Sequence, residues 1–172
     1  EKTLLQHTLD TILPFEFGSK VLVLGANNSK ILAATSTQGF EVIQNQHWQQ
    51  GIGSSISLAM QHALNNSSVA HVLFFLSDQP FVNKELINSL IKSHRNEITA
   101  CRYQDNVGVP AIFSRRYFKE LTELQGDKGA KKVMVRYKSA TTIVEFEMGY
   151  FDIDTQEDLK KLNELNQEKL WK

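Results

Sequence analysis

The stretch from His71 to Pro80, HVLFFLSDQP, constrains the fold more than any other part of this sequence. Its apolar run, Val72 to Leu76, shows no alternation with polar residues and ends abruptly in a polar tail. Such a run is typical of a central parallel strand covered on both faces, although periodicity alone leaves a buried helix segment open. Pro80 favours the strand, because a proline pushes the preceding residue towards extended geometry. The stretch therefore predicts an α/β sheet with this strand near its middle.

The position of Asp78 makes it the first candidate site residue. In an open α/β sheet, ligands bind at the carboxyl ends of the strands. Asp78 follows the apolar run at such an end, where the core stops. A carboxylate at this place predicts a site where a divalent metal is held against a phosphate.

Further strands and helices alternate along the chain. Apolar, β-branched segments predict strands at 19–24, 40–43, 98–103 and 141–147, and Asn83 is expected to cap a helix over 84–93. Strands that alternate with helices of about ten residues imply right-handed βαβ crossovers. The predicted fold is a single-domain, doubly wound α/β fold of the Rossmann-like kind. Its sheet is expected to be mainly parallel, with about six or seven strands and helices on both faces.

The segment NVGVPAIFS, residues 106–114, is expected to stand apart from the central strands. It is punctuated by Gly108 and Pro110. Because proline has no N–H to donate to a strand ladder, Pro110 predicts an edge strand or a crossing piece.

Charge and cysteine content exclude several classes of protein. The chain has 19 Lys and Arg against 19 Asp and Glu, so no basic surface for nucleic acid or membrane is expected. No apolar stretch approaches the roughly 20 residues of a bilayer span, and no signal peptide is visible. Cys101 is the single cysteine, which fits core packing and a reducing compartment. A soluble, cytoplasmic protein is predicted.

The loop before residue 56 is the second candidate site. Gly51, Gly53, Ser54 and Ser55 immediately precede a helical run. Glycines let a backbone approach a ligand closely, and a helix start offers free N–H groups. The competing interpretation is an ordinary N-cap with a flexible lead-in, because no lysine follows the serines as it does in a phosphate loop.

Two charged segments near the C-terminal end also admit two interpretations. Asp152 and Asp154 are two apart, so on an extended segment their carboxylates point the same way. Asp154 and Asp158 are alternatively capping residues around Thr155. Lys128, in GDKGAKK, is spaced to share a helix face with Lys131 and Lys132, which forms either a solvated face or a clamp for an anionic substrate.

Several of these segments, taken in order, resemble a known family. The strand followed by SDQP, then VGVPAIFSRRYFKEL, GDKGA and FDIDTQEDL, with GIGSSISLA before the strand, are similar to the MobA-like nucleotidyltransferases. The most similar subgroup is the molybdenum cofactor cytidylyltransferases, and the resemblance runs from Leu4 to Leu162. Lys131 stands where the subgroup commonly has Arg, and Gln156 replaces a usual Pro. The family's N-terminal strand and Gly-rich loop are not found, so residues 1–172 are expected to form the domain without them.

The resemblance implies a reaction and a set of site residues. The reaction is transfer of CMP from CTP to the phosphate of molybdopterin cofactor, with release of pyrophosphate and with Mg²⁺ as the metal. Asp78, with Asp152 or Asp154, is expected to hold the metal and act in catalysis. The resemblance places the nucleotide on Gly51, Gly53, Ser54, Ser55 and Ser77. It places the acceptor on Gly108, Pro110, Asp127, Lys128 and Lys131.

Two different functions remain open from the sequence alone. One is that of another MobA-like transferase, which uses GTP or acts on a sugar phosphate. The second is that of a non-catalytic, cofactor-handling module of the same fold, because fold similarity alone does not justify a catalytic role. The expected partners are an NTP, a phosphate-bearing acceptor and, transiently, a molybdoenzyme or its chaperone; no nucleic acid or membrane is expected.

Overall fold

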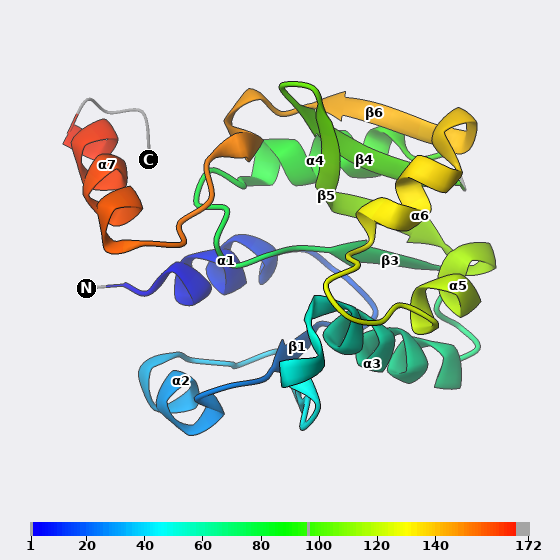
Figure 1. Ribbon diagram of the computed structural model, residues 1–172, viewed down its shortest axis with the longest axis horizontal. Coiled ribbons are helices and arrows are strands. Elements are labelled where there is room, and N and C mark those ends of the chain that lie inside the picture. The colour runs from blue at the N-terminus through cyan, green and yellow to red at the C-terminus, as the bar shows by residue number, and fades with distance from the viewer. Residues whose placement is uncertain (1, 96, 168–172) are drawn as a thin grey trace.

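The computed structural model describes residues 2–95 and 97–167, and its strands form two separate sheets (Figure 1). The smaller sheet pairs β1 (Val21–Leu24) with β2 (Glu41–Gln44) in parallel. The larger sheet has the order β3-β5-β4-β6, in which β5 runs antiparallel to both neighbours and β4 runs parallel to β6. Its strands are β3 (His71–Phe74), β4 (Ile98–Tyr103), β5 (Asn106–Ser114) and β6 (Thr141–Glu145).

Helices connect the strands, and several begin at side-chain caps. Thr3 and Asn83 each accept a hydrogen bond from a backbone N–H of the first turn. None of the helices within 2–95 and 97–167 is both long and apolar enough to cross a membrane. The α-helices are α1 (Leu4–Ile12), α2 (Asn28–Ala34), α3 (Ile52–Asn65), α4 (Lys84–Ser93), α5 (Phe118–Thr122), α6 (Lys131–Arg136) and α7 (Gln156–Gln167).

The larger sheet carries a hydrophobic core on each face. On one face, Ala111 and Phe113 of β5 pack with residues of α3, α5 and α6. On the other face, Ile112 packs with residues of α1, α4 and α7. Successive residues of β5 thus point to opposite faces, as the period of a strand requires. The predicted α/β class with helices on both faces is confirmed.

The single cysteine lies in the second of these cores. Cys101 of β4 is fully buried, and burial raises the pKa of its thiol to about 12. The thiol is therefore protonated at neutral pH and packs as an apolar side chain, as the sequence predicted.

The prediction for the segment around Pro110 was wrong, because β5 is an interior strand. It lies between β3 and β4. The register with β4 shifts between Ala100 and Cys101, whose partners are Ala111 and Gly108, so Pro110 falls inside this irregularity. A proline is tolerated in an interior strand at a bulge, where no ladder hydrogen bond needs its missing N–H.

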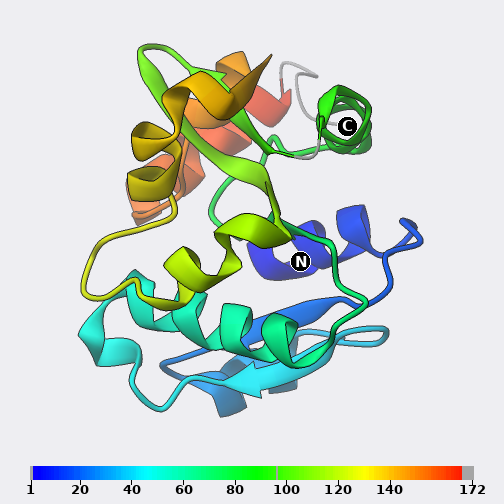
Figure 2. The same cartoon turned by 90° about the vertical axis from the view of Figure 1, so that its right-hand side faces the viewer.

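The apolar stretch 71–76 forms a strand as predicted, although its place in the sheet differs from the prediction. Only His71–Phe74 forms β3, the strand lies at the edge of the larger sheet instead of its middle, and its pairing with β5 is antiparallel instead of parallel. In Figure 1 the smaller sheet lies below this edge, and Figure 2 also shows the two sheets one above the other. β3 therefore faces β1 across the space between the sheets.

Candidate active site

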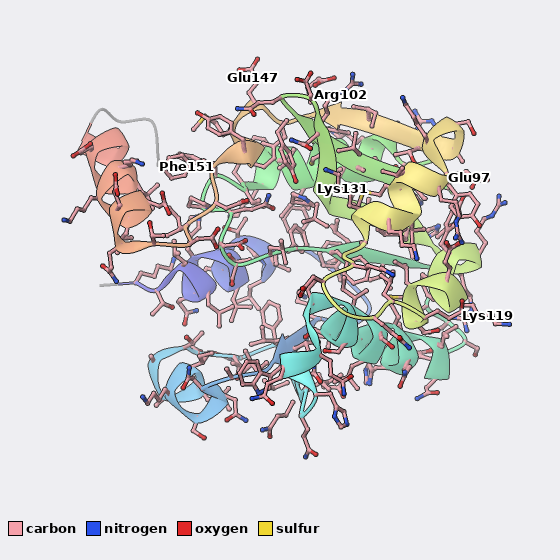
Figure 3. The ribbon with its side chains drawn as sticks, viewed as in Figure 1. Glu97, Arg102, Lys119, Lys131, Glu147 and Phe151 are labelled. Atoms are coloured by element: carbon pink, nitrogen blue, oxygen red, sulfur yellow. The ribbon has the colours of Figure 1, made fainter. Side chains whose placement is uncertain are left out.

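The segments that carry the predicted carboxylates lie side by side beyond the end of β3. The backbone N–H of Ile153 donates to the carbonyl of Asp78 over 2.9 Å. This bond joins the end of β3 to the segment between β6 and α7, which carries Asp152 and Asp154 on either side of Ile153. Phe151, labelled in Figure 3, strengthens the junction by packing edge-on against Phe81, with 5.5 Å between ring centroids.

The three carboxylates influence one another electrostatically. Burial raises the pKa of Asp78, and the charges of Asp152 and Asp154 raise it further. Burial also raises the pKa of Asp152, as does the charge of Asp154, while a hydrogen bond from Gln79 lowers it. No Lys, Arg or His within 2–95 and 97–167 is among the causes of these two pKa shifts, so the carboxylates form a site of negative potential.

Asp78 and its neighbour Gln79 are unusual in their hydrogen bonding. Asp78 Oδ1 and Gln79 Oε1 are buried and have no hydrogen-bond partner among the described residues. Gln79 is only 2% exposed, and its Nε2 donates to the carbonyl of Gly149 over 3.3 Å. A buried oxygen without a partner is costly unless water, a cation or a ligand satisfies it. Gln79 was not predicted as a site residue. The sequence feature that could have indicated it is its position directly after Asp78 and before Pro80.

These residues fit a divalent metal of the magnesium type. Within the described ranges, no group of three or more His, Cys, Asp and Glu side chains is gathered in a way that could hold a metal. Mg²⁺ is usually bound by one or two carboxylates together with waters and substrate phosphates, so it does not require such a group. The unpartnered oxygen of Asp78 and the raised pKa values of Asp78 and Asp152 agree with binding of this kind.

Tyr103 connects the acidic cluster to the segment around Gly108, and the sequence did not reveal it. A Cβ at Gly108 or at Gly149 would collide with the Tyr103 ring, so both glycines make room for this side chain. Burial raises the pKa of Tyr103, and the negative charge of Asp152 raises it further. The phenol therefore remains protonated beside the carboxylates.

The glycines of the second candidate segment serve packing against a neighbouring loop. Gly51 is the N-cap of α3 and has φ 91°, a conformation that favours glycine. A Cβ at this position would collide with Gly126, and one at Gly53 would lie 2.8 Å from the backbone nitrogen of Gln125. The N–H of Gly53 donates to the carbonyl of Gly126 over 2.9 Å. This contact brings the segment 51–55 beside the loop that carries Asp127 and Lys128.

The serines that follow are held by Asn45, a residue that the sequence did not single out. Asn45 is 2% exposed at the end of β2. Its Nδ2 donates to Ser54 Oγ over 2.8 Å and to Ser55 Oγ over 2.9 Å, and its Oδ1 accepts from the N–H of His47. Ser54 in turn donates to the carbonyl of Gly51 over 2.8 Å. The serine hydroxyls are therefore oriented by the protein before any ligand binds.

A cavity of about 1690 Å³ adjoins the start of α3, the segment before Asp78 and the start of α6, whereas Asp78, Asp152 and Asp154 do not line it. Ile52 and Tyr103 also contribute to its wall. Several residues that were predicted to bind nucleotide or acceptor line it, namely Ser55, Ser77, Gly108, Asp127 and Lys131.

The lysines at 128 and 131 do not form the helix face that their spacing suggested. α6 begins at Lys131, so Lys128 lies in the preceding loop, is exposed and does not share a helix face with Lys131. Lys131 Nζ donates to Asn106 Oδ1 over 2.8 Å, at the start of β5 (Figure 3). Pro110, another predicted contact of the acceptor, is buried within the sheet.

The predicted cap of the last helix is present. The N–H of Thr155 donates to Asp158 Oδ2 over 3.0 Å, and the N–H of Asp158 donates to Thr155 Oγ1 over 3.2 Å. The hydrogen bond from the Thr155 hydroxyl is the main cause of the lowered pKa of Asp158. Asp158 is therefore a capping residue, and it fixes the start of α7 at Gln156, two residues after Asp154.

Comparison with known proteins supports this picture of the fold. Nicotine blue oxidoreductase of Paenarthrobacter nicotinovorans is 25% identical over 173 residues, which cover 94% of this chain and 83% of that protein. The crystal structure of Rv0371c from Mycobacterium tuberculosis H37Rv in complex with manganese is 29% identical, with a TM-score of 0.73, over 94% of this chain and 87% of that one.

A more distant structure shares the fold. Molybdopterin-guanine dinucleotide biosynthesis protein A from Archaeoglobus fulgidus has a TM-score of 0.65 at 20% identity, over 96% of this chain and 86% of that one. The family model described as the MobA-like NTP transferase domain matches residues 1–141. The chain therefore belongs to the family of MobA-like NTP transferase domains.

Proposed function

We propose that this protein transfers CMP from CTP to the phosphate of a molybdopterin-type acceptor and releases pyrophosphate. The observation that carries the proposal is the pair Asp78 and Asp152, two partly buried carboxylates with raised pKa values that lie together at the end of β3. Such a pair suits a metal–triphosphate complex, whose positive metal offsets the repulsion between the carboxylates.

In the proposed reaction, an acceptor phosphate oxygen attacks the α-phosphorus of CTP, and the bond to the pyrophosphate oxygen breaks. This chemistry depends on positioning and charge neutralisation more than on a protein nucleophile. Asp78, with Asp152 or Asp154, would hold Mg²⁺, which supplies positive charge to the reacting phosphates when bound.

The remaining roles in the proposal are positioning roles. Ser55 and Ser77 line the cavity and orient the nucleotide by hydrogen bonds, and Gly51, Gly53 and Ser54 hold the segment that carries Ser55 in place. Lys131 lines the cavity as a cation for the acceptor's phosphate. Gly108 and Asp127 border the acceptor side, and Lys128 and Pro110 belong to the same two segments.

The comparisons support a divalent metal and a molybdopterin-type acceptor in general terms. A relative binds manganese, and a protein of the same fold is named for molybdopterin-guanine dinucleotide biosynthesis. The specific identities, Mg²⁺ as the metal, CTP as the nucleotide and molybdopterin as the acceptor, are part of our proposal. Cytoplasmic location and a transient contact with a molybdoenzyme or its chaperone belong to the same proposal.

A redox reaction is a second candidate, because a relative that aligns with 94% of this chain is named an oxidoreductase. In that case the cavity would hold a nucleotide as a carrier of electrons, and no pyrophosphate would form. GTP-dependent transfer, transfer to a sugar phosphate and a non-catalytic role of the same fold are the remaining candidates.

A labelled-product assay separates these candidates. The chain is incubated with Mg²⁺, molybdopterin cofactor and either CTP or GTP labelled at the α-phosphate. We expect labelled acceptor and pyrophosphate in equal amounts with CTP, and loss of both with Asp78→Asn. Asp10→Asn, on the exposed side of α1, is the matched control and should keep the activity. A preference for GTP would favour GTP-dependent transfer. If no pyrophosphate is released with either CTP or GTP, the result contradicts transferase activity.

A further inference from the structure

Tyr103 lies where the cavity approaches the acidic cluster. This residue ends β4 and lines the cavity together with Gly108 and Lys131, whereas Asp78 and Asp152 do not line it. The charge of Asp152 nevertheless acts on the Tyr103 phenol, so the two groups are near each other. Tyr103 is therefore placed between the carboxylates and the space that is open to a substrate.

Two glycines make room for the Tyr103 side chain. A Cβ at Gly108 would lie 2.0 Å from the phenol oxygen, and a Cβ at Gly149 would lie 2.5 Å from the ring atom Cδ1. Neither glycine has a positive φ, so the backbone conformation does not require glycine at either position. Glycine at 108 is therefore explained by the position of the Tyr103 hydroxyl, and glycine at 149 by the position of the ring.

The phenol of Tyr103 keeps a donor hydrogen for a ligand. Gln79 contributes a side-chain hydrogen bond to Tyr103 and another to Asp152, while Gln79 Oε1 has no partner among the described residues. Gln79 therefore donates through its amide nitrogen, and the phenol oxygen accepts. Asp78 Oδ1 also has no partner within the described ranges, and Asp152 acts on Tyr103 through its charge. The phenolic hydrogen is thus not used by these neighbours.

A cation is held close to the same hairpin. Tyr103 and Asn106 are directly opposite each other where β4 turns into β5, and Lys131 Nζ donates to Asn106 Oδ1 over 2.8 Å. Arg102, the neighbour of Tyr103 in β4, points to the opposite face of the strand and forms an ion pair with Glu145 over 3.3 Å. An ammonium group and a phenol beside one cavity suit an anion with several acceptor oxygens, such as a phosphate.

We propose that Tyr103 binds the phosphate monoester of the acceptor by donating its phenolic hydrogen to a phosphate oxygen, with Lys131 as the counter-charge. This inference rests on the proposed function and adds the residue that recognises the reacting group of the acceptor. The phosphate would lie between the cavity and the cluster of Asp78 and Asp152. The competing interpretation is that Tyr103 only fills the space beside Gly108 and Gly149.

The variant Tyr103→Phe separates these two interpretations, because it removes the hydroxyl and keeps the ring. We expect the KM for the acceptor to rise about 10- to 100-fold, as for loss of a hydrogen bond to a charged group. The KM for CTP should change by less than about twofold, because the nucleotide is bound elsewhere in the site. An unchanged KM for the acceptor would show that the ring alone matters and would overturn the inference.

The matched control is Tyr137→Phe, which makes the same change at the other end of β4. Tyr137 packs edge-on against Tyr117, with 4.9 Å between ring centroids. The Tyr117 hydroxyl donates to Glu97, which directly precedes β4. We expect Tyr137→Phe to leave both KM values unchanged.

Carbon-13 NMR tests the phosphate contact without requiring catalysis. The chain contains four tyrosines, so labelling of the tyrosine Cζ atoms gives few resonances, which single Tyr→Phe variants assign. Inorganic phosphate is the probe, and chloride at the same ionic strength is its control. We expect phosphate, and not chloride, to shift the Tyr103 resonance saturably and to leave that of Tyr137 in place. Lys131→Ala should weaken the apparent phosphate affinity about five- to tenfold.

The two experiments separate this inference from the proposed function. A Tyr103 resonance that responds to phosphate, together with a raised KM for the acceptor in Tyr103→Phe, supports the inference. The same response without pyrophosphate release from CTP or GTP would reject the proposed reaction and still support a phosphate site at Tyr103. A resonance that does not respond to phosphate, or that responds equally to chloride, would overturn the inference even if the protein is an active transferase.

Discussion

The larger sheet and the smaller sheet differ in how fully their strands are enclosed. Ile98, Ala100 and Phe113, in the two middle strands of the larger sheet, are 0% exposed. All residues of β1 except Leu24 are only partly buried, and Val42 of β2 is 37% exposed. The sequence of β1, VLVL, is at least as apolar as those of β4 and β5, so its lower burial comes from the smaller number of neighbouring strands. A strand with partners on both sides and helices on both faces is enclosed, whereas a two-stranded sheet is marginal on its own.

The first prediction compares one leucine from each region. Leu121, on α5, is 0% exposed in the core of the larger sheet, and Leu22 of β1 borders the cavity. We expect Leu121→Ala to lower the free energy of unfolding by about 2–5 kcal/mol, because it leaves a cavity in a packed core. Leu22→Ala should cost less than about 1.5 kcal/mol, because its side chain is incompletely removed from water. Urea unfolding followed by circular dichroism measures both, and equal losses would contradict the comparison.

The second prediction concerns the polar anchor of the smaller sheet. Asn45→Ala removes the hydrogen bonds that connect the end of β2 to Ser54 and Ser55. We expect a loss of about 1–3 kcal/mol in unfolding free energy, because buried groups lose their partners. Asn28→Ala, at the exposed start of α2, makes the same substitution without a buried network and should change stability by less than about 0.5 kcal/mol. Equal effects would show that Asn45 does not anchor the serines.

The third prediction concerns the effect of pH on the acidic cluster. A carboxylate whose pKa is raised in the folded state favours folding at low pH, and this contribution is lost as the pH rises from the ordinary aspartate pKa through the folded value. At neutral pH, Asp78→Asn should therefore stabilise the fold, by about 0.5–1 kcal/mol after allowance for partial exposure. Thermal unfolding at pH 4 and pH 7 measures the effect. If Asp78→Asn is less stable than the parent at pH 7, the result contradicts an unfavourable environment for the ionised Asp78 carboxylate in the folded protein.

The fourth prediction compares two lysines whose substitution should have the smallest effect on stability. Lys131 lines the cavity, whereas Lys128 is exposed outside it. Lys131→Ala should weaken acceptor binding by roughly five- to tenfold through loss of a charge-assisted contact, and Lys128→Ala should weaken it less. Both should change the unfolding free energy by less than about 0.5 kcal/mol. If Lys131→Ala leaves acceptor affinity intact, its contact with Asn106 is structural only.

Local signals in the sequence predicted the elements that depend on them. The strand at 98–103 and the helix at 84–93 agree with the structure to the residue, because a short apolar run, helical apolar periodicity and the Asn83 cap are encoded within the segments themselves. The association of Asp78 with Asp152 was also expected from a simple rule, because ligand-binding residues of α/β sheets lie at the carboxyl ends of the strands.

Features that depend on distant neighbours were missed. The register shift that lets Pro110 sit in an interior strand involves Ala100 and Cys101 of another strand. Asn45 matters only because folding brings β2 beside the start of α3. The glycines at 51 and 53 serve the approach of the loop at 126, which their own segment does not reveal.

The most direct test of the central claim is calorimetric titration of CTP in the presence and absence of Mg²⁺. It is run on the unaltered chain, on the Asp78→Asn variant and on the Asp10→Asn control. The account predicts CTP binding that requires both Mg²⁺ and Asp78. CTP binding that is unaffected by Asp78→Asn or by removal of Mg²⁺ would contradict a metal–nucleotide site at the end of β3.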